Sequence, residues 1–303
     1  MPRHRTFRAA AACALLIAAT GTLAGAATTA VSAPAGGTLF VANTDTARVE
    51  LYPAEQPKAA PTGSITQGVL SPYNLAVDAS GTLYVQNGNN TITEYPRGTT
   101  SPSKTLQVTS PSGTGVFVAV GPDGTVYSAN RGVDEIYEFA DGSTQITGIL
   151  GLPSPDKPSS VAVSSANNVY IGYSKSTVPG AAGVWVFPGG QSPGHDLGIT
   201  LTYGGGLGLD PDGNLLAGDA GTQMIAIYKP GASKPFRKIS TAPYAPYQFA
   251  FDAGGKHLYV VGGKPSAVLV YDYATGAPAW TVQQGLSGVG FSLGVAFDPA
   301  AKL

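Results

Sequence analysis

Residues 72–85 read Pro72-Tyr-Asn-Leu-Ala-Val-Asp-Ala-Ser-Gly-Thr-Leu-Tyr-Val85, a pattern that predicts an apolar strand, a glycine turn and a second apolar strand. Residues 246–260 repeat it as Pro246-Tyr-Gln-Phe-Ala-Phe-Asp-Ala-Gly-Gly-Lys-His-Leu-Tyr-Val260. Six copies align on the apolar residue after the turn, at Leu39, Leu83, Val126, Val169, Leu215 and Leu258. Their period of 43 to 46 residues is typical of β-propeller blades.

The copy that completes the set is split between the two ends of the chain. Residues 293–298 supply a first strand that stops after its turn, and residues 37–43 supply a second strand that has no first. A closed ring pairs the two halves and removes the free strand edges that invite aggregation. The sequence therefore predicts an all-β fold, a six-bladed β-propeller of four-stranded blades closed by pairing the C-terminal inner strand with the N-terminal strands.

The beginning of the chain has the order of a secretory signal. Arg3, Arg5 and Arg8 precede an apolar run at residues 9–19, and small residues follow at 23–26. We expect residues 1–26 to be a signal peptide, residues 27–36 a flexible leader and residues 37–303 the propeller, and we expect a secreted, extracellular protein. The apolar run is too short for a membrane span, and no later stretch approaches the roughly 20 apolar residues that a span needs. Cys13 is the only cysteine, so no disulfide forms within the chain.

Charge excludes one class of partner. Removing three arginines with the signal from the 17 basic residues leaves 14 against 18 acidic ones, a net charge of about −4. We therefore expect no nucleic acid as a partner. Only 12% of the residues are charged and 41 are glycine, a composition common in secreted all-β proteins. We expect a monomer.

Within the second copy we expect strands near residues 74–78, 82–86, 91–95 and 105–108, and we expect the Pro- and Gly-rich residues 53–61 and 96–103 to connect one blade to the next. No helix is needed. Every third strand ends in an aromatic residue, which we expect to fill the wedge between neighbouring sheets. These residues are Tyr52, Tyr95, Phe139, Phe187, Tyr228 and Tyr271.

The stretch from Pro72 to Tyr95 resembles the NHL repeat, in the pattern Pro-x-x-Leu-Ala-Val-Asp-x-x-Gly-Thr-Leu-Tyr-Val-x-Asn-x-x-Asn-x-Ile-x-x-Tyr. The chain as a whole is similar to the six-bladed NHL and gluconolactonase-like propellers, and the resemblance covers essentially all of the chain after the expected signal. The matching residues are those that build blades. The resemblance therefore implies a fold more strongly than an activity.

The gluconolactonase-like resemblance implies a catalytic divalent ion in the central channel, held by an acidic residue and amides ahead of the inner strands. The residues in that column are Tyr73, Val116, Ser159, Gly205, Tyr247 and Leu293, and those in the next are Asn74, Phe117, Ser160, Gly206, Gln248 and Gly294. Two amides and no carboxylate make a poor calcium site.

The same family resemblance also implies a second enzymatic interpretation, an amidating-lyase-like or streptogramin-lyase-like activity that uses metal-binding histidines at the channel mouth. After the expected signal the chain has only His195, in a loop, and His257, in a turn, and we expect both to be unclustered surface residues. The string Gly290-Phe-Ser-Leu-Gly294 fits a hydrolase motif but leads into a strand where that motif requires a helix. Asp210-Pro-Asp-Gly-Asn214 begins like a calcium loop, but its position predicts a hairpin turn.

Short polar residues follow the second strand in four copies: Asn43, Asn87, Asn130 and Asp219. The structural interpretation is that they cap the following turn by bonding its backbone. The alternative is a ring of groups on one face that hydrogen-bonds a sugar or a peptide.

We expect an uncharged, aromatic channel mouth, since tyrosines and amides begin the inner strands. Tyr rings with amide neighbours suit a glycan or peptide ligand, although the tyrosines could also simply close the end of the ring. The candidate ligand-binding residues are Tyr73, Asn74, Ser159, Tyr203, Tyr247 and Gln248, with Tyr244 in a neighbouring loop. We expect no catalytic residue, no metal and no cofactor. The function predicted is an extracellular binding or interaction platform; the alternative is a divergent metal-dependent lactone hydrolase or lyase.

Overall fold

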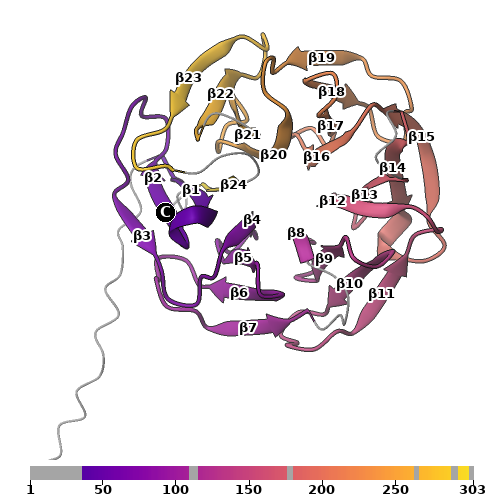
Figure 1. Ribbon diagram of the computed structural model, residues 1–303, viewed down its shortest axis with the longest axis horizontal. Coiled ribbons are helices and arrows are strands. Elements are labelled where there is room, and N and C mark those ends of the chain that lie inside the picture. Colours follow the sequence, from indigo (N-terminus) through magenta and orange to yellow (C-terminus); the bar gives the residue numbers. More distant parts are fainter. Residues whose placement is uncertain (1–35, 109–114, 176–179, 263–265, 288–292, 300–303) are drawn as a thin grey trace, which may run out of the picture.

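The computed structural model describes residues 36–108, 115–175, 180–262, 266–287 and 293–299. Within these residues 24 strands form six four-stranded sheets, arranged as blades around a central axis (Figure 1). The predicted six-bladed propeller is confirmed. The expected signal peptide and nearly all of the leader lie outside the described residues. In the described part of the chain, no helix is long and apolar enough to cross a membrane.

The strands of each blade are given from the channel outward. Blade 1 contains β24 (Leu293–Asp298), β1 (Thr38–Asn43), β2 (Arg48–Pro53) and β3 (Gly63–Ile65). Blade 2 contains β4 (Pro72–Val77), β5 (Leu83–Asn87), β6 (Thr91–Tyr95) and β7 (Lys104–Gln107). Blade 3 contains β8 (Gly115–Val120), β9 (Val126–Asn130), β10 (Glu135–Phe139) and β11 (Gly148–Gly151).

The second half of the ring repeats this arrangement. Blade 4 contains β12 (Lys157–Val163), β13 (Val169–Ser174), β14 (Ala182–Phe187) and β15 (His195–Leu201). Blade 5 contains β16 (Gly204–Leu209), β17 (Leu215–Asp219), β18 (Met224–Tyr228) and β19 (Arg237–Ser240). Blade 6 contains β20 (Pro246–Phe251), β21 (His257–Gly262), β22 (Val268–Asp272) and β23 (Pro278–Val282). Two short 3-10 turns, η1 (Thr44–Thr46) and η2 (Pro188–Gly190), are the helical elements of the described residues.

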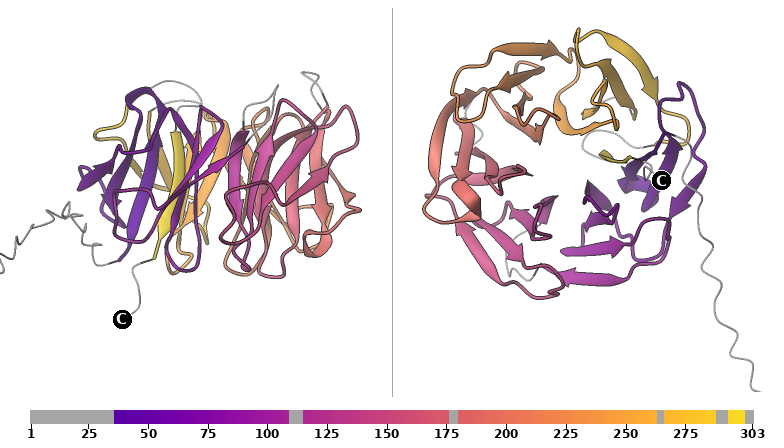
Figure 2. Two further views of the ribbon diagram at one scale, coloured as in Figure 1. Left: turned by 90° about the horizontal axis from the view of Figure 1, so that it is seen from below. Right: turned by 180° about the vertical axis from the view of Figure 1, so that it is seen from behind.

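The ring closes in blade 1, where the yellow β24 lies beside the indigo β1 (Figures 1 and 2). The two strands are antiparallel over their full lengths, from Thr38 opposite Asp298 to Asn43 opposite Leu293. Arg97 of blade 2 holds the end of β24 through two hydrogen bonds to the Asp298 carboxylate, at 2.8 Å and 2.6 Å. The predicted pairing of the chain ends is therefore confirmed.

The core is divided among the six junctions between blades, and each junction has its own cluster of buried apolar side chains. The aromatic residue that ends each third strand belongs to the cluster its blade shares with the preceding blade. All six are at most 4% exposed. Phe139, for example, packs with Tyr84, Ile92 and Leu106 of blade 2. The predicted wedge role of this column is confirmed.

The predicted roles of two loops are wrong. Residues 54–62 and 96–103 connect the third strand to the fourth within blades 1 and 2, whereas residues 66–71 connect blade 1 to blade 2. The fourth strand is short and pairs only with the third, so its sequence has little of the alternating pattern that predicts a strand. The Pro-rich loop before it therefore looks like a connection between blades. Strand bounds in blade 2 differ from the expected ones by at most two residues.

An aspartate closes the turn between the first two strands in several blades. The Asp210 carboxylate accepts hydrogen bonds from the backbone N–H groups of Asp212, at 3.0 Å, and Asn214, at 2.8 Å. Gly213, at φ +80°, takes the left-handed conformation that this turn requires. The hairpin interpretation of residues 210–214 is therefore confirmed. We call the end of the ring that carries these turns the hairpin face.

Candidate functional site at the channel mouth

The inner strands begin at the end of the ring opposite the hairpin face. Tyr73 and Tyr247 are the second residues of β4 and β20, and Tyr203 comes immediately before β16. We call this end, defined by Tyr73, Tyr203 and Tyr247, the tyrosine face. It is where the sequence predicted a ligand-binding mouth.

The inner strands of all six blades line a cavity of about 280 Å³ in the central channel. Its described lining is mainly Val, Leu, Ala and Phe, and the polar side chains among it are those of Asn74, Tyr247 and Gln248. No carboxylate or imidazole is among these lining residues. A channel lined by uncharged side chains suits a neutral ligand group.

Gln248 connects three blades. Its Oε1 accepts a hydrogen bond from the backbone N–H of Val295 in β24, at 2.8 Å, and its Nε2 donates to the carbonyl of Leu75 in β4, at 2.6 Å. The side chain can cross β24 because residue 294 is glycine: a Cβ there would lie 3.0 Å from Gln248 Oε1. Both polar atoms of the Gln248 amide are therefore engaged with the backbone of neighbouring inner strands.

Asn74 and Ser159 are also buried. Asn74, 2% exposed, accepts a hydrogen bond from the backbone N–H of Val118 in the next inner strand, at 2.9 Å. Gln248 bonds the equivalent backbone group of its own neighbour, so this column joins adjacent inner strands. The hydroxyl of Ser159 lies against Gly204 and has no hydrogen-bond partner among the described residues.

The exposed groups of the tyrosine face are aromatic. Tyr73 in blade 2 is 37% exposed and Tyr203 in blade 5, on the other side of the ring, is 39% exposed. Each ring lies over a glycine of its own blade: a Cβ at Gly88 would be 3.0 Å from Tyr73 Cε2, and one at Gly221 would be 2.8 Å from Tyr203 Cδ2. The rings are thus supported on one side and open on the other.

The third tyrosine is closer to the channel. Tyr247 is half-buried and lines the cavity. Burial raises its pKa, which the positive charge of Arg131 partly opposes, so the phenol is neutral at physiological pH. Tyr244 packs against the apolar cluster between blades 5 and 6, where it has a structural role.

The polar column after the second strand holds the loops that carry the tyrosines. Asn87 accepts a hydrogen bond from the backbone N–H of Leu70, at 2.9 Å, three residues before Tyr73. Asp219 accepts from the backbone N–H groups of Thr202, at 3.0 Å, and Tyr203, at 3.1 Å. Asn130 bonds the N–H of Gly132 within its own turn. Asn130 and Asp219 therefore bond the backbone of the turn that follows them, as the structural interpretation predicts. For Asn87 that interpretation is wrong, because its side chain bonds the loop before β4.

Asp219 is held in its charged form. Burial acts to raise its pKa, but hydrogen bonds from the backbone of Thr202, Tyr203 and Thr222 outweigh burial and lower the pKa of this carboxyl below its ordinary value. The carboxylate also accepts from the N–H of Gly221, at 3.0 Å. It therefore joins the loop before β16 to the turn after β17, and so places the Tyr203 ring over Gly221.

We expect Asp219→Ala to destabilise the protein by about 1.5–3 kcal/mol at neutral pH, because the backbone N–H groups that donate to this carboxylate would lose a charged acceptor. The folded pKa lies below the unfolded one, so the contribution is complete above about pH 4 and is lost as the pH falls through the folded pKa. Urea unfolding from pH 2 to 7 measures this. The exposed Asp45→Ala serves as the control; an Asp219→Ala deficit that did not shrink toward pH 2 would contradict the assignment.

The predicted surface position is confirmed for His195 and wrong for His257. His195, at the start of β15, is exposed, but His257, at the start of β21, is buried at 8% exposure and bonded to Asp252. The turn-closing aspartate draws the imidazole inward, and the ring packs on Trp280. Both residues lie away from the tyrosine face. In the hydrolase-like string, only Gly294 falls within the described residues, and it lies in β24.

Comparison with known proteins supports the fold. No protein-family model matches the sequence, and no curated protein matches it. Among solved structures, a chain of a nidogen/laminin complex matches with a TM-score of 0.68 at 19% identity, covering 86% of this chain and 98% of its own. Hydrazine synthase of Kuenenia stuttgartiensis matches with a TM-score of 0.61 at 18% identity, covering 91% and 92%. At these identities the likeness concerns the fold, which agrees with the six-bladed β-propeller described above.

Proposed function

We propose that this chain is an exported, NHL-like propeller that binds an uncharged glycan or peptide segment at its tyrosine face, without catalysis. The observation that carries the proposal is the pair of exposed rings, Tyr73 and Tyr203, above a channel whose described lining has no charged side chain. Large aromatic side chains at a protein surface contribute contact area at small cost in conformational entropy, and tyrosine adds a hydroxyl for hydrogen bonding.

The contacts that hold each tyrosine side chain favour ligand binding over a role in simply closing the end of the propeller. Tyr73 and Tyr203 lie on glycines that leave room for them, and Asn87 and Asp219 hold the loops that carry them. A ring fixed in this way loses little freedom when a ligand stacks on it. Among the predicted residues, Gln248 already uses both amide atoms, and Asn74 is buried in the channel lining. The proposal therefore rests on Tyr73, Tyr203 and Tyr247.

The uncharged channel also favours binding over the alternative activities. Hydrolysis of a lactone and the lyase reaction both need a metal site or a titratable group near the substrate. The described channel lining offers amides, a tyrosine and apolar side chains. The nidogen/laminin complex is an instance of a propeller of similar shape in a protein assembly, which supports use of this scaffold as an interaction platform.

A screen of immobilised neutral glycans and uncharged peptides tests the proposal. We expect wild-type protein to bind a member of one collection and the double variant Tyr73→Ala/Tyr203→Ala to bind it at least tenfold more weakly, since each truncated aromatic contact costs about 1–2 kcal/mol. Phe236→Ala is the control, because Phe236 is also an exposed aromatic residue, at 52%, but lies between β18 and β19. Binding only to charged probes, or equal binding by the double variant, would contradict the proposal.

A further inference from the structure

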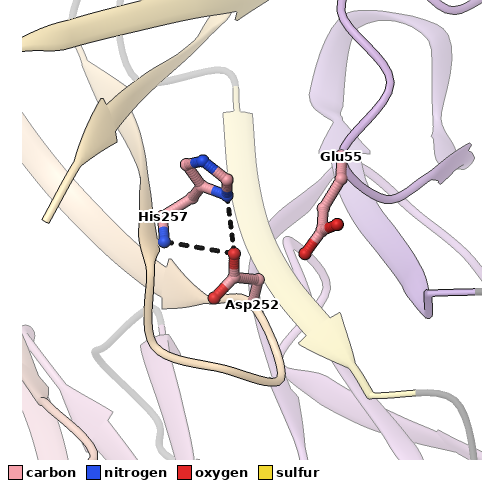
Figure 3. A group of neighbouring side chains, drawn as sticks. All are labelled: Glu55, Asp252 and His257. Atoms are coloured by element: carbon pink, nitrogen blue, oxygen red, sulfur yellow. Dashed lines mark hydrogen bonds and ion pairs between the residues drawn. The ribbon is translucent and has the colours of Figure 1, made fainter.

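Three possible metal ligands from two blades meet beside the ring closure, on the hairpin face. Asp252 follows β20 and His257 begins β21, both in blade 6, and Glu55 comes from the loop between β2 and β3 in blade 1. One ligand atom of each lies within 4.8 Å of the others. In Figure 3 the Glu55 carboxylate points from the blade 1 side toward the other two residues, next to the yellow β24.

Two of the three side chains are already fixed. Asp252 accepts hydrogen bonds from the backbone N–H groups of Lys256, at 2.7 Å, and His257, at 3.1 Å. Its Oδ2 lies 2.7 Å from Nδ1 of His257, and the imidazole packs edge-on against Trp280 with ring centroids 4.7 Å apart. A ligand set that is held before an ion arrives loses little entropy on binding it.

The blade turn itself does not require the histidine. The position just before the aligned apolar residue is Thr or Asn in the other five blades: Thr38, Thr82, Thr125, Asn168 and Asn214. In blade 2, Asp78 closes the same turn by accepting from Ser80 and Thr82, each at 2.9 Å. The imidazole in blade 6 is therefore an addition to a turn that forms without it.

The group has more negative than positive charge. Asp252 and Glu55 are both carboxylates, and among the described residues neither forms an ion pair with Lys or Arg; the ion-pair partner of Asp252 is His257. Asp252 is fully buried as a side chain and Glu55 is exposed, so the group is open to solvent on one side. A divalent cation entering from that side would neutralise the two carboxylates.

We propose that Glu55, Asp252 and His257 bind one zinc-class divalent cation that ties the N-terminal part of blade 1 to blade 6. One imidazole nitrogen and two carboxylate oxygens are a ligand set suited to zinc, with the fourth position left to water, whereas calcium takes six to eight oxygens. In the bound form the cation takes the place of the proton between Nδ1 and Asp252 Oδ2, so the imidazole binds through Nδ1 in its neutral form. The site is on the opposite face from the tyrosines and is independent of the proposed ligand binding.

Calorimetric titration of the untagged, chelator-treated chain with zinc chloride tests this site. We expect wild-type protein to bind one equivalent, and its melting temperature to rise by about 5 °C when free zinc is a hundredfold above the dissociation constant. Calcium chloride should give no binding. Glu55→Gln keeps the loop and its shape but removes a charged ligand, so zinc should bind at least ~10-fold more weakly.

His257→Gln should abolish the one-equivalent binding, whereas His195→Gln, which removes an exposed imidazole on β15, should leave it unchanged. Since Glu55 is exposed, its variant reports on ion binding even if replacement of the buried His257 disturbs folding. The proposal is overturned if wild-type protein does not bind zinc, if Glu55→Gln binds as tightly as wild type, or if His195→Gln is the variant that loses binding.

Discussion

Deleting residues 293–303 should prevent the chain from folding to a stable monomer. The deletion removes β24, and with it the full-length pairing to β1 and the buried side chains of Val295, Ala296 and Phe297. It also removes Asp298, the partner of Arg97. Blade 1 would keep three strands with an open inner edge, and unpaired edges promote aggregation. Size-exclusion chromatography and urea unfolding would show aggregation or the loss of a cooperative transition.

Moving the same strand to the other end of the chain should restore the fold. Joining residues 293–300 directly to Gly37 creates the turn Asp298-Pro-Ala300-Gly37-Thr-Leu39, which copies Asp78-Ala-Ser-Gly-Thr-Leu83 of blade 2. The ends of β24 and β1 already lie opposite each other at Asp298 and Thr38, so a tight hairpin can connect them. A folded deletion variant, or a rearranged chain that stays unfolded, would contradict the role assigned to β24.

Phe139→Ala should destabilise the protein by about 3–5 kcal/mol, the usual cost of truncating a fully buried aromatic residue. Phe139 is 0% exposed and fills the wedge between blades 2 and 3, where it packs with Ile92 and Leu106. Truncation of this ring leaves a cavity between the two sheets, and the cost rises with the volume of that cavity. The measurement is the free energy of unfolding in urea.

Phe236→Ala provides the comparison for this variant. Phe236 is 52% exposed, and its ring contacts the Lys229 side chain, with Nζ 4.6 Å from the ring centroid. Its truncation should cost less than ~1 kcal/mol. Equal losses for the two variants would mean that the aromatic column does not carry the packing between blades.

The periodic features of the fold could be predicted from the sequence because they depend on local pattern. The spacing of Leu39, Leu83 and the equivalent residues sets the number of blades, and the split copy predicts which strands close the ring. The aromatic column could be predicted for the same reason, because residues such as Tyr95 and Phe139 recur at one position of every copy.

The contacts that connect different blades could not be predicted in this way. Gln248 reaches the carbonyl of Leu75 only because Gly294, in a third blade, leaves a path for it. The approach of Glu55 to His257 depends on the course of the loop at residues 54–62, and the repeat pattern does not specify which residues of another blade this loop approaches. The burial of His257 did have a sequence signal, since Asp252 occupies the turn-closing position five residues earlier.

The exposure of the tyrosines also required the structure. The sequence groups Tyr73, Tyr203 and Tyr247 with the amides Asn74 and Gln248, whereas the fold exposes two of the rings and buries both amides. Tyr73 near the start of β4 and Tyr203 just before β16 lie at the end of the propeller. Asn74 and Gln248 instead hydrogen-bond the backbone of neighbouring inner strands. The proposed function accordingly depends on the rings more than on the amides.

Hydrogen–deuterium exchange with the tightest-binding neutral glycan or peptide from the screen tests the central claim most directly. Our account predicts protection confined to the tyrosine face, in residues 66–74, 202–206 and 242–248, with the hairpin-face turns at residues 78–82, 210–214 and 252–257 unchanged. It also predicts that this protection is the same in low and high salt, since an uncharged ligand is not screened. Protection of the hairpin face alone, or protection that disappears in high salt, would contradict the claim.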